Sequence, residues 1–465
     1  MELPSWKKVK WWKYVFIPVL LLLPWIYRFY WNVSPLKLPP HKGATRVPEL
    51  PGRAKHPAGS TVLRGEPASL VRVRGTKTLL ISAYLEHQTN KKKVRVISIA
   101  LRSEKAAFRC HLLCRGKLLI SDGAIDFHKD HFGFPYGTAD IMCPLPPGCE
   151  TPTNISLTSA GSKPEELDQL GPGFLEIQNQ KSVTDSFRYN FTVCFSAMYN
   201  FTNVLQLVQS LEMLQLLGVN RVVLYKTNCS ADTQRVLDSY TEKGLVEVIP
   251  WSLSKYLNVS RRAFPNKSPG DLHYFGQIAA LNDFLYRYRY RSRYVALHDV
   301  DELILPQSVD RWLELLPLLE KTLGADKCYQ FENHWFPVEF ELPPPKSQTL
   351  PRQDQWKNIS GVNILTHLYR EPPPTKPTFN NFKIIVNPRA VSRVTVHGAL
   401  NSVKGCVWVD RNVAHMYHVR SRAVANLNPK TLIYDGRLLD YSTRLTSAVN
   451  RKLRESGLLP GNGTN

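Results

Sequence analysis

Two aspartates two residues apart, Asp299 and Asp301, are the side chains of this chain best suited to hold a metal ion. They stand in the segment HDVDEL, directly after the apolar run 294–297, which predicts a buried strand. Paired carboxylate oxygens suit Mg²⁺ or Mn²⁺, and such an ion would bridge the phosphates of a nucleotide diphosphate. Aspartates at this spacing are also common in solvated loops, so the hypothesis depends on their position at a strand end.

The chain around this motif alternates between strand and helix patterns. The predicted strands are residues 191–198, 221–225, 246–250 and 294–297, and the predicted helices are residues 203–217, 231–243 and 273–288. Strands that alternate with helices of this length predict βαβ units and a mostly parallel sheet. Ligands bind beyond the carboxyl ends of the strands in such sheets, and Asp299 and Asp301 fall at that edge.

Several segments resemble glycosyltransferase family 92 in their order and spacing. They are YNFTVCFSAMYN (189–200), GVNRVVLYKTNCS (218–230), GLVEVIPW (244–251), YFGQIAALNDFLYRYR (274–289), YVALHDVDELILP (294–306), FNNFKIIVNPRAVSRVTVHGAL (379–400) and HMYHVRSR (415–422). Together they span over half of the chain. The resemblance implies an α/β fold. It places a GT-A-like nucleotide-sugar domain of the Rossmann type over residues 185–450.

The resemblance also implies an activity. Members of this family are understood to be inverting galactosyltransferases of the Golgi, which use UDP-galactose and Mn²⁺. The implied acceptor is a terminal sugar of N-glycans, galactose or fucose, joined in β1,4 linkage. Asp301 would bind Mn²⁺ directly, and Asp299 would reach the metal or the ribose of the donor. Two alternatives stay open: transfer of another UDP-sugar, and an inactive glycan-binding protein of the same fold.

GT-A enzymes often supply a third metal ligand, a histidine, from a late strand. His397 follows the predicted strand 391–396, and we expect it to bind the metal because a neutral imidazole can join two carboxylates around Mn²⁺. His418 stands in HVR, where the family pattern has HYR, and we expect it to line the substrate pocket. His415 is a third candidate. Each of them could instead be a hydrogen-bonded structural histidine.

An inverting transfer also needs a carboxylate that removes the proton of the acceptor hydroxyl. Glu332 in FENHWF is our candidate for this catalytic base, because it lies between the aspartate pair and the histidines. Glu339 and Asp354 are alternatives in the same span. The neighbouring Trp335 is a candidate substrate-binding residue that could stack on an acceptor sugar, although an indole also packs well in a core.

The N-terminus predicts a membrane anchor. Residues 1–13 form a lysine-rich tail, residues 14–31 an apolar run with an aromatic border, and residues 32–60 a proline-rich stem. Lysines precede the run and no small-residue cleavage site follows it, so we expect an uncleaved signal-anchor with a cytoplasmic N-terminus. With the family resemblance, this predicts a single-pass type II protein of the Golgi membrane whose catalytic domain is lumenal.

Residues 61–173 carry short apolar and β-branched runs, which predict a small β-rich lumenal domain ending in a linker at 159–173. Eight cysteines, an even number, favour disulfides in an oxidising compartment. Zinc is an alternative for four of them, at positions 110, 114, 143 and 149, although their spacing is not a standard zinc pattern. Nine N-x-S/T sites agree with a secretory protein, at Asn32, Asn154, Asn190, Asn200, Asn228, Asn258, Asn266, Asn358 and Asn462.

The net charge of +22 comes mainly from the first 115 residues, which hold 22 Lys and Arg against 5 Asp and Glu. The rest of the chain is close to balanced, so it lacks the basic working surface that nucleic-acid binding needs. The alternating aromatic and basic run YRYRYRSRY at 286–294 joins a predicted helix to a buried strand. We therefore expect no nucleic-acid partner, and we leave a homo-oligomer as a possibility.

Overall fold

The structure is a computed structural model, and it describes residues 70–89, 91–161, 173–182, 186–345, 350–373, 382–421 and 426–460. Residues 60–465 form one compact unit, which contains all of the described residues. The predicted tail, anchor and stem lie outside the described residues, as do the sequons at Asn32 and Asn462. Within the described part of the chain, no helix is long and apolar enough to cross a membrane.

The first part of the chain builds a mainly antiparallel sheet, as its β-branched runs predict. Its strands are β1 (Val71–Arg72), β2 (Leu79–Glu86), β3 (Lys93–Leu101), β4 (Phe108–Cys114), β5 (Lys117–Phe127), β6 (Tyr136–Pro144), β7 (Pro152–Ser159) and β8 (Leu175–Gln178). They lie in the order β1-β2-β3-β6-β5-β4-β7-β8, and β2 also pairs with β8. Strand β8 therefore extends this sheet beyond residue 173, where we expected the β-rich domain to end.

Two disulfides stabilise this sheet. Cys110 on β4 is bonded to Cys143 on β6, and Cys114 on β4 is bonded to Cys149 in the turn before β7. The four cysteines for which zinc was an alternative therefore form disulfides, and they offer no thiolate to a metal.

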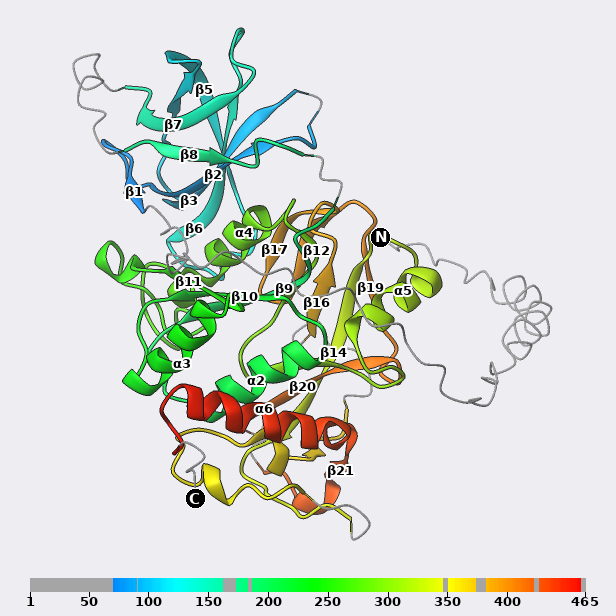
Figure 1. The fold of residues 1–465 in the computed structure, drawn as a ribbon. Helices are drawn as coiled ribbons and strands as arrows, with labels where there is room; N and C mark the ends of the chain where they lie inside the picture. The colour runs from blue at the N-terminus through cyan, green and yellow to red at the C-terminus, as the bar shows by residue number, and fades with distance from the viewer. Residues whose placement is uncertain are drawn as a thin grey trace, which may run out of the picture. The chain divides into compact units, whose positions relative to one another are not determined.

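The second part contains a nine-stranded mixed sheet with the main path β11-β10-β9-β12-β16-β14-β20-β13 (Figure 1). Its strands are β9 (Tyr189–Met198), β10 (Arg221–Lys226), β11 (Val246–Pro250), β12 (Ser292–Leu297), β13 (Glu302–Pro306), β14 (Cys328–Pro337), β16 (Phe382–Val386), β19 (Cys406–Trp408) and β20 (Ala414–Arg420). The four strands from β11 to β12 run parallel, whereas β16 is antiparallel to both of its neighbours. Short pairs complete the fold: β15 (Tyr369–Arg370) with β21 (Ile433–Tyr434), and β17 (Val391–Thr395) with β18 (Gly398–Ser402).

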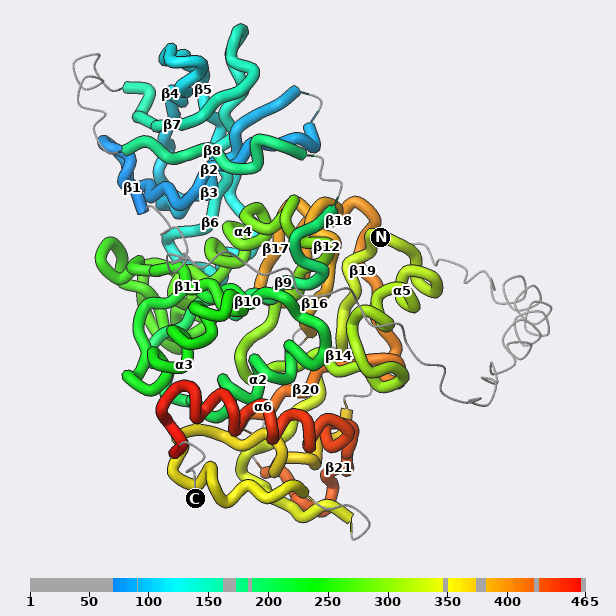
Figure 2. Tube along the Cα trace, viewed as in Figure 1, coloured from blue at the N-terminus to red at the C-terminus, as the bar shows by residue number. Residues whose placement is uncertain are grey.

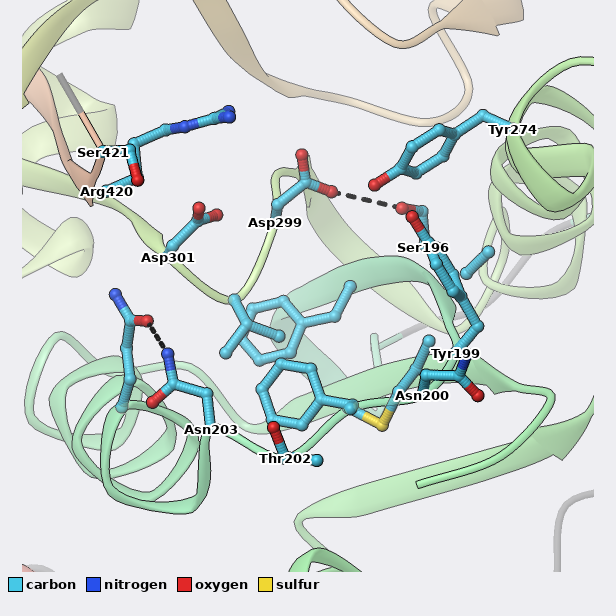
Figure 3. Close-up of a pocket in the computed structure, with 16 residues that line it drawn as sticks. Ser196, Tyr199, Asn200, Thr202, Asn203, Tyr274, Asp299, Asp301, Arg420 and Ser421 are labelled. Atoms are coloured by element: carbon cyan, nitrogen blue, oxygen red, sulfur yellow. Dashed lines mark hydrogen bonds between the residues drawn. The ribbon is translucent and has the colours of Figure 1, made fainter. Parts of the chain in front are cut away.

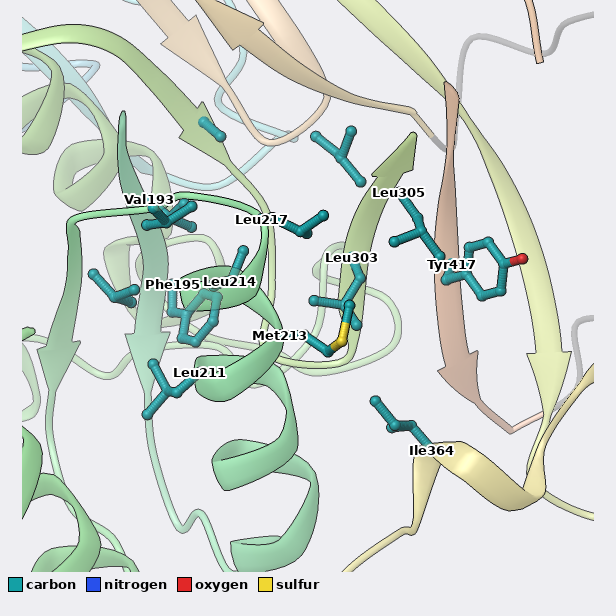
Figure 4. Packing of buried hydrophobic residues seen from close by; sticks show 14 of the residues in the cluster. Val193, Phe195, Leu211, Met213, Leu214, Leu217, Leu303, Leu305, Ile364 and Tyr417 are labelled. Atoms are coloured by element: carbon teal, nitrogen blue, oxygen red, sulfur yellow. The ribbon is translucent and has the colours of Figure 1, made fainter. Parts of the chain in front are cut away.

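Helices cover both faces of this sheet (Figure 2). They are α2 (Val204–Leu216), α3 (Ala231–Glu242), α4 (Gln277–Arg287), α5 (Trp312–Leu323) and α6 (Ser442–Glu455). Successive β9 side chains point to opposite faces, so Val193 and Phe195 pack in one core with α2, α3, α5 and α6, while Cys194 packs in the other core with α4. Figure 4 shows Leu211 and Leu214 of α2 beside Phe195. Truncating such a buried leucine to alanine costs about 2–5 kcal/mol.

The alternation of strands and helices is confirmed, with two local differences. The predicted helix 273–288 begins only at Gln277, because Tyr274, Phe275 and Gly276 have φ values of 32°, 51° and 71° and form a separate 3₁₀ turn. The strand predicted at 391–396 exists as β17, but it belongs to a two-stranded hairpin and not to the central sheet. Both differences change where nearby side chains lie at the site.

The two sheets are joined through α4 by a buried polar network. Asp283 of α4 accepts hydrogen bonds from Tyr84 of β2 at 2.6 Å and from Tyr225 of β10 at 2.6 Å, and Arg287 lies 3.1 Å from the same carboxylate. Apolar residues of β2 and β3, including Leu79 and Ile97, pack in the same core as α4. The β-rich region is thus part of the structural support of the second sheet.

Candidate active site

Asp299 and Asp301 leave the end of β12 and face a cavity of about 470 Å³ (Figure 3). The walls come from segments distant in sequence: the end of β9 and residues 199–203, Tyr274 before α4, and Arg420 with Ser421 at the end of β20. The cavity therefore opens beyond the carboxyl ends of parallel strands, which is the edge predicted from the strand and helix pattern.

Donors from three elements hold Asp299 by both of its oxygens. Ser196 Oγ lies 3.2 Å and Gln277 Nε2 3.4 Å from Oδ1, and Lys383 Nζ lies 3.1 Å from Oδ2. Desolvation by the surrounding protein would raise the pKa of the Asp299 carboxyl, but these partners, led by Lys383, lower it overall. Asp299 is therefore a fixed carboxylate whose oxygens already have protein partners.

Lys383 is a buried cation beneath the aspartate pair. It is 3% exposed on β16, and its Nζ also lies 3.2 Å from Glu302 Oε2, which accepts the backbone N–H of Asp299 at 2.7 Å. Burial alone would lower the pKa of Lys383, but Asp299 and Glu302 raise it. One lysine thus partly neutralises two carboxylates and fixes the turn that presents Asp301.

Asp301 faces His418 across the junction of β13 and β20. His418 Nε2 lies 3.4 Å from Asp301 Oδ2, and the backbone N–H of Val419 donates to Asp301 O at 3.0 Å. The other ring nitrogen, Nδ1, is buried without a hydrogen-bond partner, 3.7 Å from Glu302 Oε1. A carboxylate and an imidazole this close, with a second aspartate beside them, are a donor set that fits Mn²⁺.

His397 lies at a different place from the one its sequence context predicted. It sits in the turn between β17 and β18, and its Nδ1 is 3.4 Å from the carbonyl oxygen of Phe382. Burial, with Lys383 adding to it, lowers the pKa of His397 to about 4, so the ring is neutral at physiological pH. Neither His397 nor His418 is among the described residues that line the cavity, and what distinguishes them is that His418 pairs with Asp301. Asp299 and His418 are among the charges that act on His397, and its role as a metal ligand stays a prediction.

The structure places Glu332 away from the aspartate pair. Residues alternate along β14, so Glu332 and Trp335 lie on opposite faces of that strand. Arg411 contacts both Glu332 oxygens, at 3.0 Å and 2.9 Å, and Glu332 borders a separate depression with residues 408–412. The alternative Asp354 is exposed and pairs with Arg352 and Lys357. The described wall of the cavity holds no carboxylate besides Asp299 and Asp301.

His415 belongs to a second polar cluster on the Glu332 face of β14. Its Nε2 lies 3.2 Å from Asp435 Oδ2, and its ring stacks on His334 with centroids 4.0 Å apart. These three residues could in principle hold a metal. Arg370 Nε, however, lies 3.5 Å from the same Asp435 oxygen, and a cation there disfavours a second one. His415 thus belongs to the cluster with His334 and Asp435, and its part in binding a metal stays a prediction.

Trp335 supports the site from behind His418. The two rings stack with centroids 4.7 Å apart, and the guanidinium of Arg420 lies 5.2 Å from the indole centroid. Trp335 thus orients His418 and Arg420 and is not part of the described cavity wall.

Sequence reasoning missed several residues of the site: Ser196, Tyr274, Gln277, Lys383 and Arg420. Gln277 and Lys383 lie in or beside strands and helices with no motif of their own, so only the fold brings them to Asp299. Arg420 stands two residues after His418, in the HVR segment, where a basic residue beside a metal-binding pair could have been noticed.

A site of this kind at this edge of an α/β sheet is typical of enzymes that act on phosphate-bearing nucleotides. The family model for glycosyltransferase family 92 matches residues 189–452, more than half of the chain. The chain belongs to glycosyltransferase family 92.

Two curated proteins of Caenorhabditis elegans are similar to this chain. "Glycosyltransferase family 92 protein F13G3.3" is 29% identical over 121 residues, 26% of this chain and 23% of that protein. "Beta-1,4-galactosyltransferase galt-1" is 23% identical over 239 residues, 50% of this chain and 52% of that protein. The chain thus matches about half of the length of galt-1 and less than a quarter of the other protein.

Among solved structures, a Mycobacterium tuberculosis glucosyl-3-phosphoglycerate synthase in complex with Mn²⁺ and UDP matches 61% of this chain and 88% of its own chain. Its sequence identity is 11% and its TM-score is 0.23. At that score the likeness supports no statement about this protein.

Proposed function

We propose that this chain is an inverting, Mn²⁺-dependent transferase with a GT-A-like fold that moves galactose from UDP-galactose to a terminal sugar of N-glycans in β1,4 linkage. The observation that carries the proposal is the pairing of His418 with Asp301, which lines the cavity beside an aspartate already held by Lys383. The family and the name of the relative galt-1 support the choice of galactose and of β1,4 linkage.

In this proposal Asp301 and His418 would hold the Mn²⁺, with Asp299 beside them. The ion would supply positive charge that neutralises the donor diphosphate and stabilises the departing UDP. Arg420, which is exposed at the cavity, adds a second positive charge on the same side. Lys383 and Glu302 keep Asp299 and the following turn in place, so that little reorganisation is needed when the donor binds.

For the acceptor side of the reaction we propose no catalytic base. An inverting transfer requires a base for the acceptor hydroxyl, and Glu332 does not reach this cavity in the structure. We therefore do not propose Glu332 as the base, and we put no other residue in its place. Tyr199, stacked on Phe275 with centroids 3.8 Å apart, and Tyr274 form an aromatic wall suited to the flat face of a sugar or base.

We also propose a lumenal location in the Golgi with a type II anchor at residues 14–31. Six of the sequon asparagines, Asn190, Asn200, Asn228, Asn258, Asn266 and Asn358, are exposed in the structure, which agrees with glycosylation. Asn200 lines the cavity and accepts a hydrogen bond from Asn228 at 2.7 Å. A glycan on Asn200 would obstruct the donor, so we expect that sequon to stay unmodified.

The test is a donor and acceptor screen with the secreted fragment 61–465. Purified fragment is incubated with each UDP-sugar, with and without Mn²⁺, and with N-glycans that end in galactose, fucose or N-acetylglucosamine. Transfer of galactose that needs Mn²⁺ and gives a β1,4 linkage supports the proposal. Transfer of another sugar shows the first alternative, and glycan binding without turnover of any donor shows the second.

A further inference from the structure

Two cysteines face each other on neighbouring strands of the central sheet. Strand β19 pairs in parallel with β14, and Cys406 is the direct partner of Cys328 in that register. Backbone hydrogen bonds fix the register on both sides, from Cys328 N to Gly405 O at 3.0 Å and from Val409 N to Gln330 O at 2.9 Å. The backbone hydrogen bonds between β14 and β19 therefore place the two cysteines opposite each other, whatever the conformation of their side chains.

The spacing of paired strands suits a disulfide. Neighbouring strands lie about 4.7–4.9 Å apart, which falls inside the Cα separation of about 4.4–6.8 Å that disulfides use. Directly opposed residues also point to the same face of the sheet. The two thiols also act on each other: the neighbouring Cys328 thiol lowers the pKa of Cys406 to about 7, and Cys406 raises the pKa of Cys328.

The two thiols differ in access. Cys328 is fully buried, whereas Cys406 is exposed. An exposed thiol with a lowered pKa is the one that attacks a disulfide, because the thiolate is the nucleophile. A buried thiol in contact with it is well placed to complete the exchange.

We propose that Cys328 and Cys406 form a third disulfide, which links β14 to β19 when the chain matures in an oxidising compartment. The oxidant is a donor disulfide of an oxidoreductase or of a small thiol. The Cys406 thiolate attacks it and releases one donor thiol, and Cys328 then attacks the mixed disulfide, loses its proton and releases the second donor thiol. Two protein thiols are oxidised, and one donor disulfide is reduced to two thiols.

Two features of the chain favour this bond. The cysteines of β4 are already paired as disulfides, so the protein has bonds that need an oxidising compartment. Strand β19 is only three residues long and pairs with β14 alone among the described strands. It also follows the hairpin that carries His397 and precedes the strand that carries His418. A covalent link at β19 would anchor this connection beside the candidate active site.

Peptide mapping tests the bond directly. The secreted protein is denatured without reductant, its free thiols are blocked with N-ethylmaleimide, and it is digested with trypsin. The sequence places Cys328 in peptide 328–346 and Cys406 in peptide 405–411, and neither peptide contains a sequon. We expect the two peptides as one cross-linked species that separates on reduction. Both peptides carrying N-ethylmaleimide would overturn the proposal.

Variants give a second readout. In Cys406→Ser, the Cys328 thiol should become reactive to N-ethylmaleimide in denaturant, and the melting temperature should fall by about 3–8 °C, because a long closed loop is opened. Cys229→Ser, which removes a half-buried cysteine elsewhere, is the matched control and should leave the cross-linked species in place. If Cys406→Ser leaves Cys328 unreactive, Cys328 has another partner and the proposed pairing is wrong. If Cys406→Ser is not secreted, the wild-type peptide map decides by itself.

Discussion

The imidazole Nε2 of His418 lies 3.4 Å from the carboxylate of Asp301, while Trp335 stacks on a face of the same ring. Strand β20 brings His418 there, because Glu302, the residue after Asp301, is paired with His418 in the β13–β20 ladder. On the function proposed above, Asp301 and His418 are the pair that would bind the metal.

Asp301→Asn should abolish transfer. The amide keeps the volume of the side chain but removes the charge that would hold Mn²⁺, and losing one such electrostatic group costs about 10²–10³ in rate. The side chain is 31% exposed, so secretion and melting temperature should stay close to wild type. The measurement is galactose transfer at saturating Mn²⁺ alongside a thermal melt. Activity within about tenfold of wild type would show that the aspartate pair is not the metal site.

His418→Ala and His397→Ala should differ in their need for metal. Loss of a ligand or of a residue beside it typically weakens metal binding by about 10–100-fold, so His418→Ala should raise the Mn²⁺ concentration for half-maximal activity by that amount. His397→Ala should leave the Mn²⁺ curve nearly unchanged, because its ring contacts Phe382. The measurement is a Mn²⁺ titration of both variants. A shift in the His397 variant alone would restore the role that its strand-end position first indicated.

Tyr84→Phe should lower the free energy of unfolding of the whole fragment 61–465 and not only that of its first sheet. The change removes a donor to the buried Asp283 carboxylate, and a buried group left short of a partner costs about 1–3 kcal/mol. Urea unfolding measures the loss, and it should appear in one cooperative transition of both sheets. Two separate transitions, with only the first one shifted, would mean that the sheets are independent.

Fragments give the same distinction by another route. We expect residues 61–465 to be secreted and active, because the candidate site lies wholly within them. We expect residues 186–465 to fail, because α4 then loses its packing against β2 and β3. Secretion yield and transfer activity of the two fragments check this. A soluble and active 186–465 fragment would show that the β-rich sheet is dispensable.

Stability should fall as the pH drops from about 6.5 towards 4, partly through His273. Burial, and secondarily His397, lowers the pKa of His273 to about 4, whereas an unfolded histidine titrates near about 6.5. The unfolded chain thus binds the proton first, and the stabilisation present above pH 6.5 is lost as the pH falls through this window. His273→Phe keeps an aromatic ring to stack on Phe132 but removes the titrating group. Between pH 7 and pH 5 its free energy of unfolding should therefore fall by about 2 kcal/mol less than that of the wild type.

Urea unfolding of wild type and variant at both pH values measures that difference. Phe132→Leu is the control, because it disturbs the stack but keeps the imidazole. Its free energy of unfolding should be lower than that of the wild type at both pH values, and it should change with pH as the wild type does. An unchanged pH dependence in His273→Phe would mean that His273 does not contribute to it.

Much of this protein could be predicted from its sequence because local patterns carry local structure. The continuous run FTVCFSAM at 191–198 and the helical period in 203–217 reflect side chains that face a core, and both elements formed within two residues of the predicted bounds. The aspartate pair was found because it directly follows an apolar strand. These features depend on a few neighbouring residues, and the tertiary fold does not alter them.

Only the tertiary structure decided which distant residues meet these aspartates. His397 and His418 both follow or lie in late apolar runs, yet the pairing of β20 with β13 takes His418 to Asp301, while a local hairpin keeps His397 out of the sheet. Lys383 has no motif, and it reaches Asp299 because β16 lies beside β12. Glu332 faces away because side chains alternate along β14. Strand order and register are set by packing across the whole core, so no spacing along the chain could reveal them.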